Sequence, residues 1–239
     1  MARRPPAGET DPVTGTAARE RQPGADAPED PTGAVLRRYL DELYLWSARI
    51  NLTAVPRSEA ERRHIGESRR LLEAAAPAAG ARVVDVGSGG GVPGLVLAVL
   101  RPDLRVTLVE SDRRRAGFLV HAAGVCGCRG VTVLARRAED VGRDPAHRAG
   151  YELAVSRAAA PVAVLCELAL PLLRQGGRLV ALVGDAAAEA DRAATAAAAC
   201  GGGEPREVGH GILAITKVAA TPERFPRRPG LPSRHPLGA

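Results

Sequence analysis

The chain has 239 residues, which is enough for one domain of ordinary size with a sizeable buried core. Lysine and arginine number 33 against 27 aspartate and glutamate residues, and the net charge of +6 favours an anionic partner such as nucleic acid. The four cysteines lack zinc-ligand spacing, and no apolar run is long enough to span a bilayer. Metal sites, disulfide frameworks and membrane spans are therefore disfavoured. We expect a cytoplasmic monomer that binds no metal.

The first 32 residues are rich in proline, glycine, alanine and charge, and they show no apolar periodicity. Such a composition buries too little surface to offset chain entropy, so residues 1–32 are predicted to be a disordered extension. The domain is expected to span residues 33–239 and to begin with helices within residues 33–78. Apolar residues at helical spacing from Val35 to Trp46 predict the first helix, and a charged second helix is predicted over 58–76.

Beyond residue 80 the apolar pattern changes to short runs typical of buried strands. These runs predict five strands, at residues 82–87, 104–110, 131–134, 151–155 and 178–183. Helix-sized segments occupy residues 92–101, 112–124, about 159–174 and 185–200, and residues 204–218 predict a β-hairpin. This alternation predicts an α/β fold with a doubly wound, Rossmann-like sheet of seven strands, parallel except for an antiparallel edge pair.

The first predicted strand runs directly into a glycine-rich loop, residues 85–94, that precedes a helix. Glycines let backbone amides approach a ligand closely, and loops at the carboxyl ends of central strands are where open α/β sheets bind ligands. One spacing in the loop, Gly89-x-Gly91-x-x-Gly94, satisfies the dinucleotide pattern and leaves a nicotinamide dehydrogenase as an alternative. The chain has no Tyr-x-x-x-Lys or comparable group for handling hydride, which disfavours that alternative.

The second spacing in the loop, Asp85-x-Gly87-x-Gly89-x-Gly91, places an acid on the strand before three alternate glycines. It resembles motif I of the seven-stranded S-adenosylmethionine methyltransferases. In those enzymes an acid after the second strand binds the ribose hydroxyls of the cofactor, and Glu110 occupies that place. The loop therefore favours a methyltransferase over a dehydrogenase or a turn that binds nothing.

Further motifs along the chain narrow the resemblance to one family. They occur in the order Asn51-Leu-Thr53, Arg63-His-Ile-Gly-Glu-Ser68, the glycine loop, Glu110-Ser with Phe118-Leu, Arg137-Ala-Glu139, Ser156-Arg-Ala158, Pro171-Leu-Leu-x-x-Gly-Gly177 and the proline-rich end from Thr221 to Leu237. Over residues 35–237 this order and spacing resemble the bacterial small-subunit (16S) rRNA guanine-N7 methyltransferase family, also called glucose-inhibited division protein B. The resemblance implies transfer of a methyl group from S-adenosylmethionine to N7 of a guanine in 16S ribosomal RNA, with that RNA or the small ribosomal subunit as partner.

The resemblance also implies a set of cofactor-binding residues. Gly87 and Val92 line the cofactor site, Ala138 and Glu139 flank the adenine, and Arg157 closes the pocket. The complete predicted set is Gly87, Gly89, Gly91, Val92, Glu110, Ala138, Glu139 and Arg157.

Two polar residues among these motifs have a structural alternative. Arg157 stands in an apolar context at the end of a strand, where an unpaired charge is costly, so it either contacts the ligand or forms a salt bridge with Glu139 or Asp85. His64 is expected to be a core or capping histidine, although the family places this segment near the mouth of the active site.

Residues 220–239 form a basic tail in which arginines alternate with stiff prolines. Arginine suits phosphate, and an aromatic such as Phe225 can stack on a base, so the tail is predicted to bind RNA rather than to be a solvated terminus. The predicted RNA-binding residues are Arg224, Arg227, Arg228 and Arg234.

Guanine N7 has an in-plane lone pair and no proton, so its methylation needs alignment and no general base. We accordingly name no catalytic base. The family usually has a lysine where Val183 stands, which leaves open a methyltransferase for a small molecule or a non-catalytic RNA-binding paralogue.

Overall fold

The first helix, α1 (Pro31–Ser47), begins earlier than predicted because the sequence supplies a strong start signal. In the computed structural model, which describes residues 1–2, 30–157 and 159–238, the Asp30 carboxylate accepts the Thr32 amide at 3.1 Å and Pro31 takes the first helical position. Residues 31 and 32 are therefore helical, and the prediction of a disordered extension is wrong for them. For residues 3–29 that prediction lies outside the described residues.

The second predicted helix is divided into three kinds of helix. A 3-10 turn, η1 (Arg57–Glu59), leads into a π-helical segment, η2 (Glu61–Gly66), and then into α2 (Glu67–Ala75). The π-helical segment brings His64 and Ile65 into the interior. Wide π turns of this kind are frequent at functional sites.

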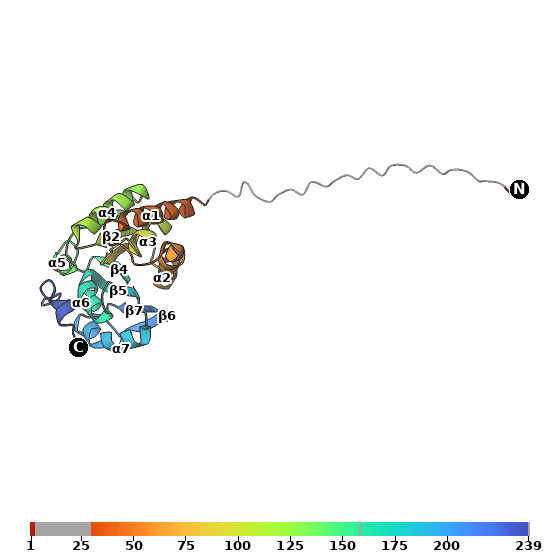
Figure 1. Ribbon diagram of the computed structural model, residues 1–239. Coiled ribbons are helices and arrows are strands. Elements are labelled where there is room, and N and C mark those ends of the chain that lie inside the picture. Colours follow the sequence, from red (N-terminus) through yellow and green to blue (C-terminus); the bar gives the residue numbers. More distant parts are fainter. Residues whose placement is uncertain (3–29, 158, 239) are drawn as a thin grey trace.

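A seven-stranded sheet lies at the centre of the molecule (Figure 1). Its strands, in spatial order, are β3 (Val131–Leu134), β2 (Arg105–Val109), β1 (Arg82–Val86), β4 (Tyr151–Arg157), β5 (Leu173–Leu182), β7 (Ile212–Thr216) and β6 (Arg206–Gly209). The pairs among β1 to β5 are parallel, and β7 runs antiparallel to both β5 and β6. This arrangement confirms the predicted doubly wound sheet with its antiparallel edge.

Helices cover both faces of the sheet, and each face has its own core (Figure 1). The connecting helices are α3 (Gly94–Leu100), α4 (Arg113–Val125), α5 (Ala138–Arg143), α6 (Val162–Ala169) with the turn η3 (Leu170–Leu172), and α7 (Ala186–Ala199). Along β1, Val83 belongs to the core shared with α1, α3 and α4, whereas Val84 belongs to the core shared with α6 and α7. The six-residue α5 was not predicted, because it is too short to show a helical period.

The order of strands reverses at β1. The chain passes from β1 outward to β2 and β3, then returns to place β4 on the other side of β1. Ligands of open α/β sheets bind outside the carboxyl ends of the strands at such a switch point. The glycine loop after β1 lies there, between the ends of β2 and β4.

The C-terminal tail is fixed to the domain rather than free. The Arg148 guanidinium donates to the carbonyls of Gly142, Thr221, Pro222 and Phe225, and the short helix α8 (Leu231–Arg234) packs against α6. Four carbonyl acceptors on one cation tie the tail to the segment after α5. Within the described ranges, no helix is long and apolar enough to cross a membrane.

Candidate active site

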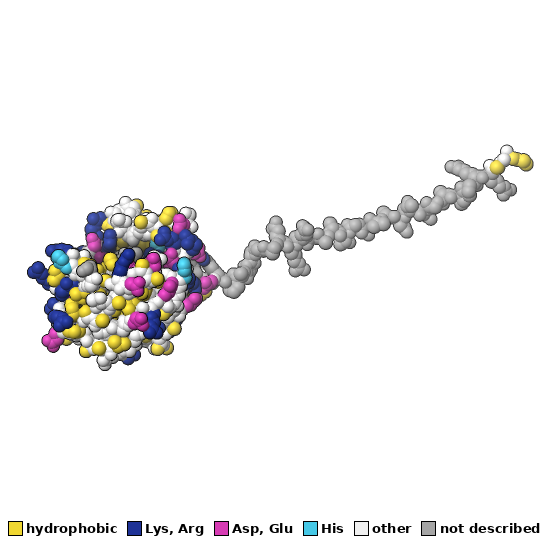
Figure 2. All heavy atoms as spheres, turned by 90° about the horizontal axis from the view of Figure 1, so that it is seen from below, with side chains coloured by type: hydrophobic (Ala, Val, Ile, Leu, Met, Phe, Trp, Pro, Cys, Tyr) yellow, Lys and Arg dark blue, Asp and Glu magenta, His cyan; other side chains and the backbone are white. Residues whose placement is uncertain are grey.

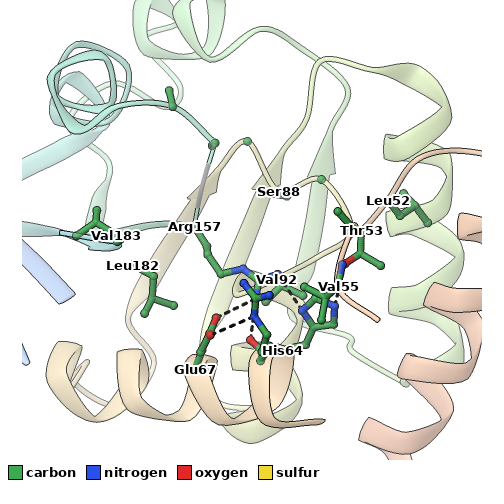
Figure 3. Close-up of a pocket in the computed structure, with 18 of the residues that line it drawn as sticks. Leu52, Thr53, Val55, His64, Glu67, Ser88, Val92, Arg157, Leu182 and Val183 are labelled. Atoms are coloured by element: carbon green, nitrogen blue, oxygen red, sulfur yellow. Dashed lines mark hydrogen bonds and ion pairs between the residues drawn. The ribbon is translucent and has the colours of Figure 1, made fainter. Parts of the chain in front are cut away.

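A cavity of about 1090 Å³ opens at the carboxyl ends of β1, β2, β4 and β5. The glycine loop forms its base, and the loop after α1 and the segment η2–α2 form one side (Figure 3). Predicted site residues that line it are Gly87, Gly89, Val92, Glu110 and Arg157.

Gly87 begins the turn of the loop and tolerates no side chain. Its φ of 76° lies in the left-handed region, and a Cβ there would stand 2.7 Å from the Cβ of Ala159. Gly91 is buried behind the loop, where a side chain would meet Leu95 and Leu119. Gly91 is therefore a packing residue in this structure and is not among the residues that line the cavity.

Asp85 lies beneath the glycine loop on β1 and is completely buried. Its Oδ2 accepts the Gly94 amide at 3.0 Å, an approach that only glycine allows because a Cβ would come within 2.6 Å of the same oxygen. Its Oδ1 has no hydrogen-bond partner among the described residues. Burial raises the pKa of this carboxyl to about 7. A buried acceptor without a donor is a feature that a ligand or an ordered water satisfies.

Glu110 follows β2 and links two backbone segments at the edge of the cavity. Its Oε2 accepts the Gly89 amide at 2.9 Å and its Oε1 accepts the Asp112 amide at 2.8 Å. These bonds hold the carboxylate in one orientation, and each ionised oxygen keeps a further lone pair. A rigid carboxylate with two acceptor sites fits a vicinal diol such as that of a ribose.

Arg157, the last residue of β4, crosses the cavity to the helical side (Figure 3). Its Nη1 lies 3.2 Å from Oε2 of Glu67 and donates to the Arg63 carbonyl at 2.7 Å. The predicted salt bridge to Glu139 or Asp85 is thus wrong, and the partner is Glu67. This carboxylate comes from a helix 90 positions earlier in the chain.

His64 is fully buried and is bonded at both ring nitrogens. Its Nδ1 lies 2.9 Å from Nη2 of Arg157, and its Nε2 lies 3.1 Å from Oγ1 of Thr53. A guanidinium can only donate, so Nδ1 accepts and Nε2 carries the proton. Burial and the adjacent Arg157 cation lower the pKa of His64 to about 4, so the ring is neutral.

The Thr53 hydroxyl is the end of this chain of hydrogen bonds. Its oxygen accepts from the Val55 amide at 3.1 Å and from the protonated Nε2 of His64. Its own proton has no recorded acceptor among the described residues, and Thr53 lines the cavity. The sequence motif Asn51-Leu-Thr53 had marked this segment without indicating that it presents a donor.

Comparison with known proteins decides the family. The family model described as rRNA small subunit methyltransferase G matches residues 33–212. The chain belongs to this family. Relatives named ribosomal RNA small subunit methyltransferase G include one from Chloroflexus aggregans, 44% identical over 216 residues that cover 85% of this chain and 90% of the relative. Another, from Moorella thermoacetica, is 37% identical over 215 residues, which cover 85% and 90%. The resemblance inferred from the motifs is thereby confirmed.

Solved structures agree on the fold. The crystal structure of a mutant of MtNAS is 14% identical and superposes with a TM-score of 0.53 over 81% of this chain and 78% of that one. At this level of identity the likeness establishes the architecture alone.

Two predicted cofactor residues of this family member lie away from the cavity lining. Ala138 is the first residue of α5, and Glu139 is buried with its Oε1 accepting the Gly230 amide at 2.8 Å. Glu139 therefore holds the tail in this structure. A contact of Ala138 or Glu139 with an adenine stays a prediction.

The tail arginines have unequal environments. Arg227 has its Nη2 2.6 Å from Oε2 of Glu167, a carboxylate that is 1% exposed, and its Nε bonds both oxygens of the same group. This guanidinium is therefore held by a buried carboxylate. Arg224 lies over the Phe225 ring at 5.0 Å and Arg228 is exposed, as is Arg234. RNA contact stays a prediction for those three.

Val183, where the resemblance implied a lysine, lines the cavity. The cavity keeps other cations, among them Arg63, Arg70 and Arg115. Among the residues that the structure describes, no group of three or more His, Cys, Asp or Glu is placed to hold a metal ion.

Proposed function

We propose that this protein transfers the methyl group of S-adenosylmethionine to N7 of a guanine in small-subunit (16S) ribosomal RNA, in the cytoplasm. Membership of the rRNA small subunit methyltransferase G family is the observation that carries the proposal. The cavity at the switch point of the sheet, with its glycine loop and fixed carboxylate, supports it independently.

The residues around the glycine loop fit the cofactor chemically. S-adenosylmethionine supplies a methyl group activated on a sulfonium, together with a ribose diol and an α-ammonium group. Glu110 has acceptor lone pairs for the diol, and the loop residues Gly87–Gly90 line the same cavity. The partnerless Oδ1 of Asp85 offers a further polar atom beneath the loop for a ligand group or a bridging water.

Four polar residues that line the cavity are unsuited to remove a proton, which favours an acceptor atom that carries none. His64 has both nitrogens engaged, and Arg157 is a permanent cation, so neither is available to remove a proton. Glu67 is paired with Arg157, and both oxygens of Glu110 accept backbone amides. A donor such as the Thr53 hydroxyl can hold the guanine in position, and methylation of N7 requires only such alignment.

The test is nucleoside analysis of small-subunit rRNA from cells with and without the gene, followed by methylation of the deficient RNA by the purified protein. Loss of one 7-methylguanosine, restored by the protein, is expected. Loss of a different methylated base would overturn the N7 assignment. An unchanged set of nucleosides would instead favour a small-molecule methyltransferase or a non-catalytic RNA-binding protein, which binding of labelled S-adenosylmethionine would then distinguish.

A further inference from the structure

A second cavity, of about 560 Å³, lies between the end of α1 and the start of α4. We call it the α1–α4 groove, and its walls include Leu45, Trp46, Arg49, Ile50, Arg113 and Gly117. None of these residues belongs to the predicted cofactor set or to the tail.

The floor of the groove is apolar and partly aromatic. Trp46 packs on Phe118, with ring centroids 5.7 Å apart, and on His121 at 5.2 Å, which fixes the plane of the indole. Leu45 is 66% exposed, an unusual position for a large apolar side chain. At Gly117 a Cβ would meet no atom within 4 Å, so the glycine keeps the groove open.

The rim of the groove is cationic. The guanidinium groups of Arg49 and Arg113 have no hydrogen-bond or ion-pair partner in the part of the chain that the structure describes. Arg114 donates from Nη2 to the Arg49 carbonyl at 3.0 Å and so ties the two walls together. No carboxylate is among the lining residues. An apolar floor with unpaired guanidinium groups at the rim is complementary to a nucleotide, whose base stacks and whose phosphate is anionic.

The groove is continuous along the chain with the active-site cavity. The segment that ends α1 passes from Trp46 and Ile50 directly to Leu52–Val55, which line the first cavity. On the other wall, Ser111 and Arg115 line the first cavity while Arg113 and Gly117 line the groove. The groove and the active-site cavity therefore share two flanking segments of the chain.

Figure 2 shows cationic side chains at several places on the face it presents, so positive charge alone does not single out one RNA-binding surface. The combination of an aromatic floor, an open glycine and unpaired cations singles out the α1–α4 groove. We propose that the α1–α4 groove binds a nucleotide of the substrate RNA that neighbours the target guanine, with the base against Trp46 and a phosphate between Arg49 and Arg113. This inference rests on the proposed function.

Trp46 is the single tryptophan of the chain, so intrinsic fluorescence reports on the groove directly. Unmethylated 16S rRNA, and a fragment that contains the target, are titrated into the full-length protein while its fluorescence is followed. Methylation of the same RNA is measured in parallel. We expect quenching that saturates with RNA binding.

Two variants test the groove without altering the first cavity. Arg49→Ala with Arg113→Ala removes the unpaired cations, and Gly117→Leu fills the open space with a residue that favours helix. Gly117→Leu is expected to raise the KM for RNA roughly tenfold, the scale for losing one base stack. The double arginine variant is also expected to raise this KM, and to make it less dependent on salt, because it removes phosphate contacts. Values of kcat at saturating RNA and the Kd for S-adenosylmethionine should not change. Arg206→Ala, which removes an exposed arginine on the edge strand β6, is the control and should retain the wild-type KM.

Failure of this inference differs from failure of the proposed function. The groove inference alone would be overturned if the wild-type protein methylates the RNA while Trp46 emission stays constant and the variants keep the wild-type KM. Defects confined to assembled subunits, with naked RNA bound and methylated normally, would assign the groove to a protein partner and also overturn it. Absence of methylation by the wild type with either substrate would count against the proposed function itself.

Discussion

Nη2 of Arg157 lies 2.9 Å from Nδ1 of His64, and because a guanidinium cannot accept, the imidazole nitrogen must. One contact between a strand end and a π-helical turn thus sets the tautomer of a buried histidine. That tautomer presents its proton to Thr53, which leaves the Thr53 hydroxyl free to donate into the cavity.

We predict that His64 remains neutral, with the proton on Nε2, down to about pH 5, because burial and Arg157 lower its pKa to about 4. Nitrogen-detected NMR of the imidazole gives both the tautomer and the pKa. Arg157→Met should raise that pKa, whereas Arg115→Met, which changes another arginine of the cavity, should not. A wild-type His64 that titrates near its ordinary value of 6.5 would contradict the assignment.

Glu110→Gln should weaken S-adenosylmethionine binding by roughly 1–3 kcal/mol, the range for a hydrogen bond to a charged group. The amide removes the charge and turns one acceptor into a donor, which also disturbs the bond to either Gly89 or Asp112. Calorimetry measures the change, with the exposed Glu73→Gln on α2 as control. Wild-type protein should give no heat with NAD. An unchanged dissociation constant for Glu110→Gln would remove the carboxylate from the cofactor site.

Arg227→Ala should destabilise the fold by about 3–5 kcal/mol, because it leaves the buried Glu167 carboxylate without its cation. Urea unfolding measures the loss, and Arg228→Ala, one residue further along and exposed, should lie within the error of wild type. Adding Glu167→Leu to Arg227→Ala should restore much of the stability, because no unpaired charge then remains. An Arg227→Ala protein as stable as wild type, but weaker in RNA binding, would return this residue to the RNA-contacting set.

Asp85 should make stability depend on pH in the direction opposite to most carboxylates. Burial raises its folded pKa to about 7 from 3.8, so the folded protein keeps a proton that the unfolded chain releases within that window. The stability of wild type relative to Asp85→Asn is therefore greatest below about pH 4 and falls as the pH rises toward 7. The fall cannot exceed about 1.4 kcal/mol per pH unit for one group. Urea unfolding of both proteins across this range measures the difference in stability. The lowered pKa of His64 makes stability rise with pH, but it does so in both proteins, so this contribution cancels in the difference. If the stabilities of the two proteins change with pH in parallel, Asp85 is ionised throughout this range in the folded protein.

The sequence predicts the parts of this molecule that are set locally. Apolar runs identify the parallel strands, and the positions of Gly87 and Glu110 at strand ends follow from them, because the carboxyl ends of parallel strands share one edge. The start of α1 was placed too late, since the Asp30-Thr32 cap is a signal of side-chain chemistry that apolar periodicity does not contain.

The partners of the charged residues could not be predicted in this way. Glu67 and Arg157 are 90 positions apart, and Glu167 and Arg227 are 60 apart, so no local pattern links either pair. Composition placed Arg227 in a basic tail, but the fold gives it a buried acid. The groove at Trp46 was equally hidden, because its two walls come from helices that only the tertiary structure brings together.

The ion pair between Glu167 and Arg227 also constrains how the protein is made. Glu167 belongs to α6, yet its cation lies beyond β7, so every strand of the sheet is synthesised before that cation leaves the ribosome. A nascent chain that has reached only β7 has an unpaired Glu167 carboxylate on the face of the sheet that α6 and α7 cover. So does a chain that a protease has shortened from its carboxyl end. Cellular quality control removes chains in proportion to their unfolded fraction. A chain that lacks Arg227 is therefore expected to be removed faster than one that contains it.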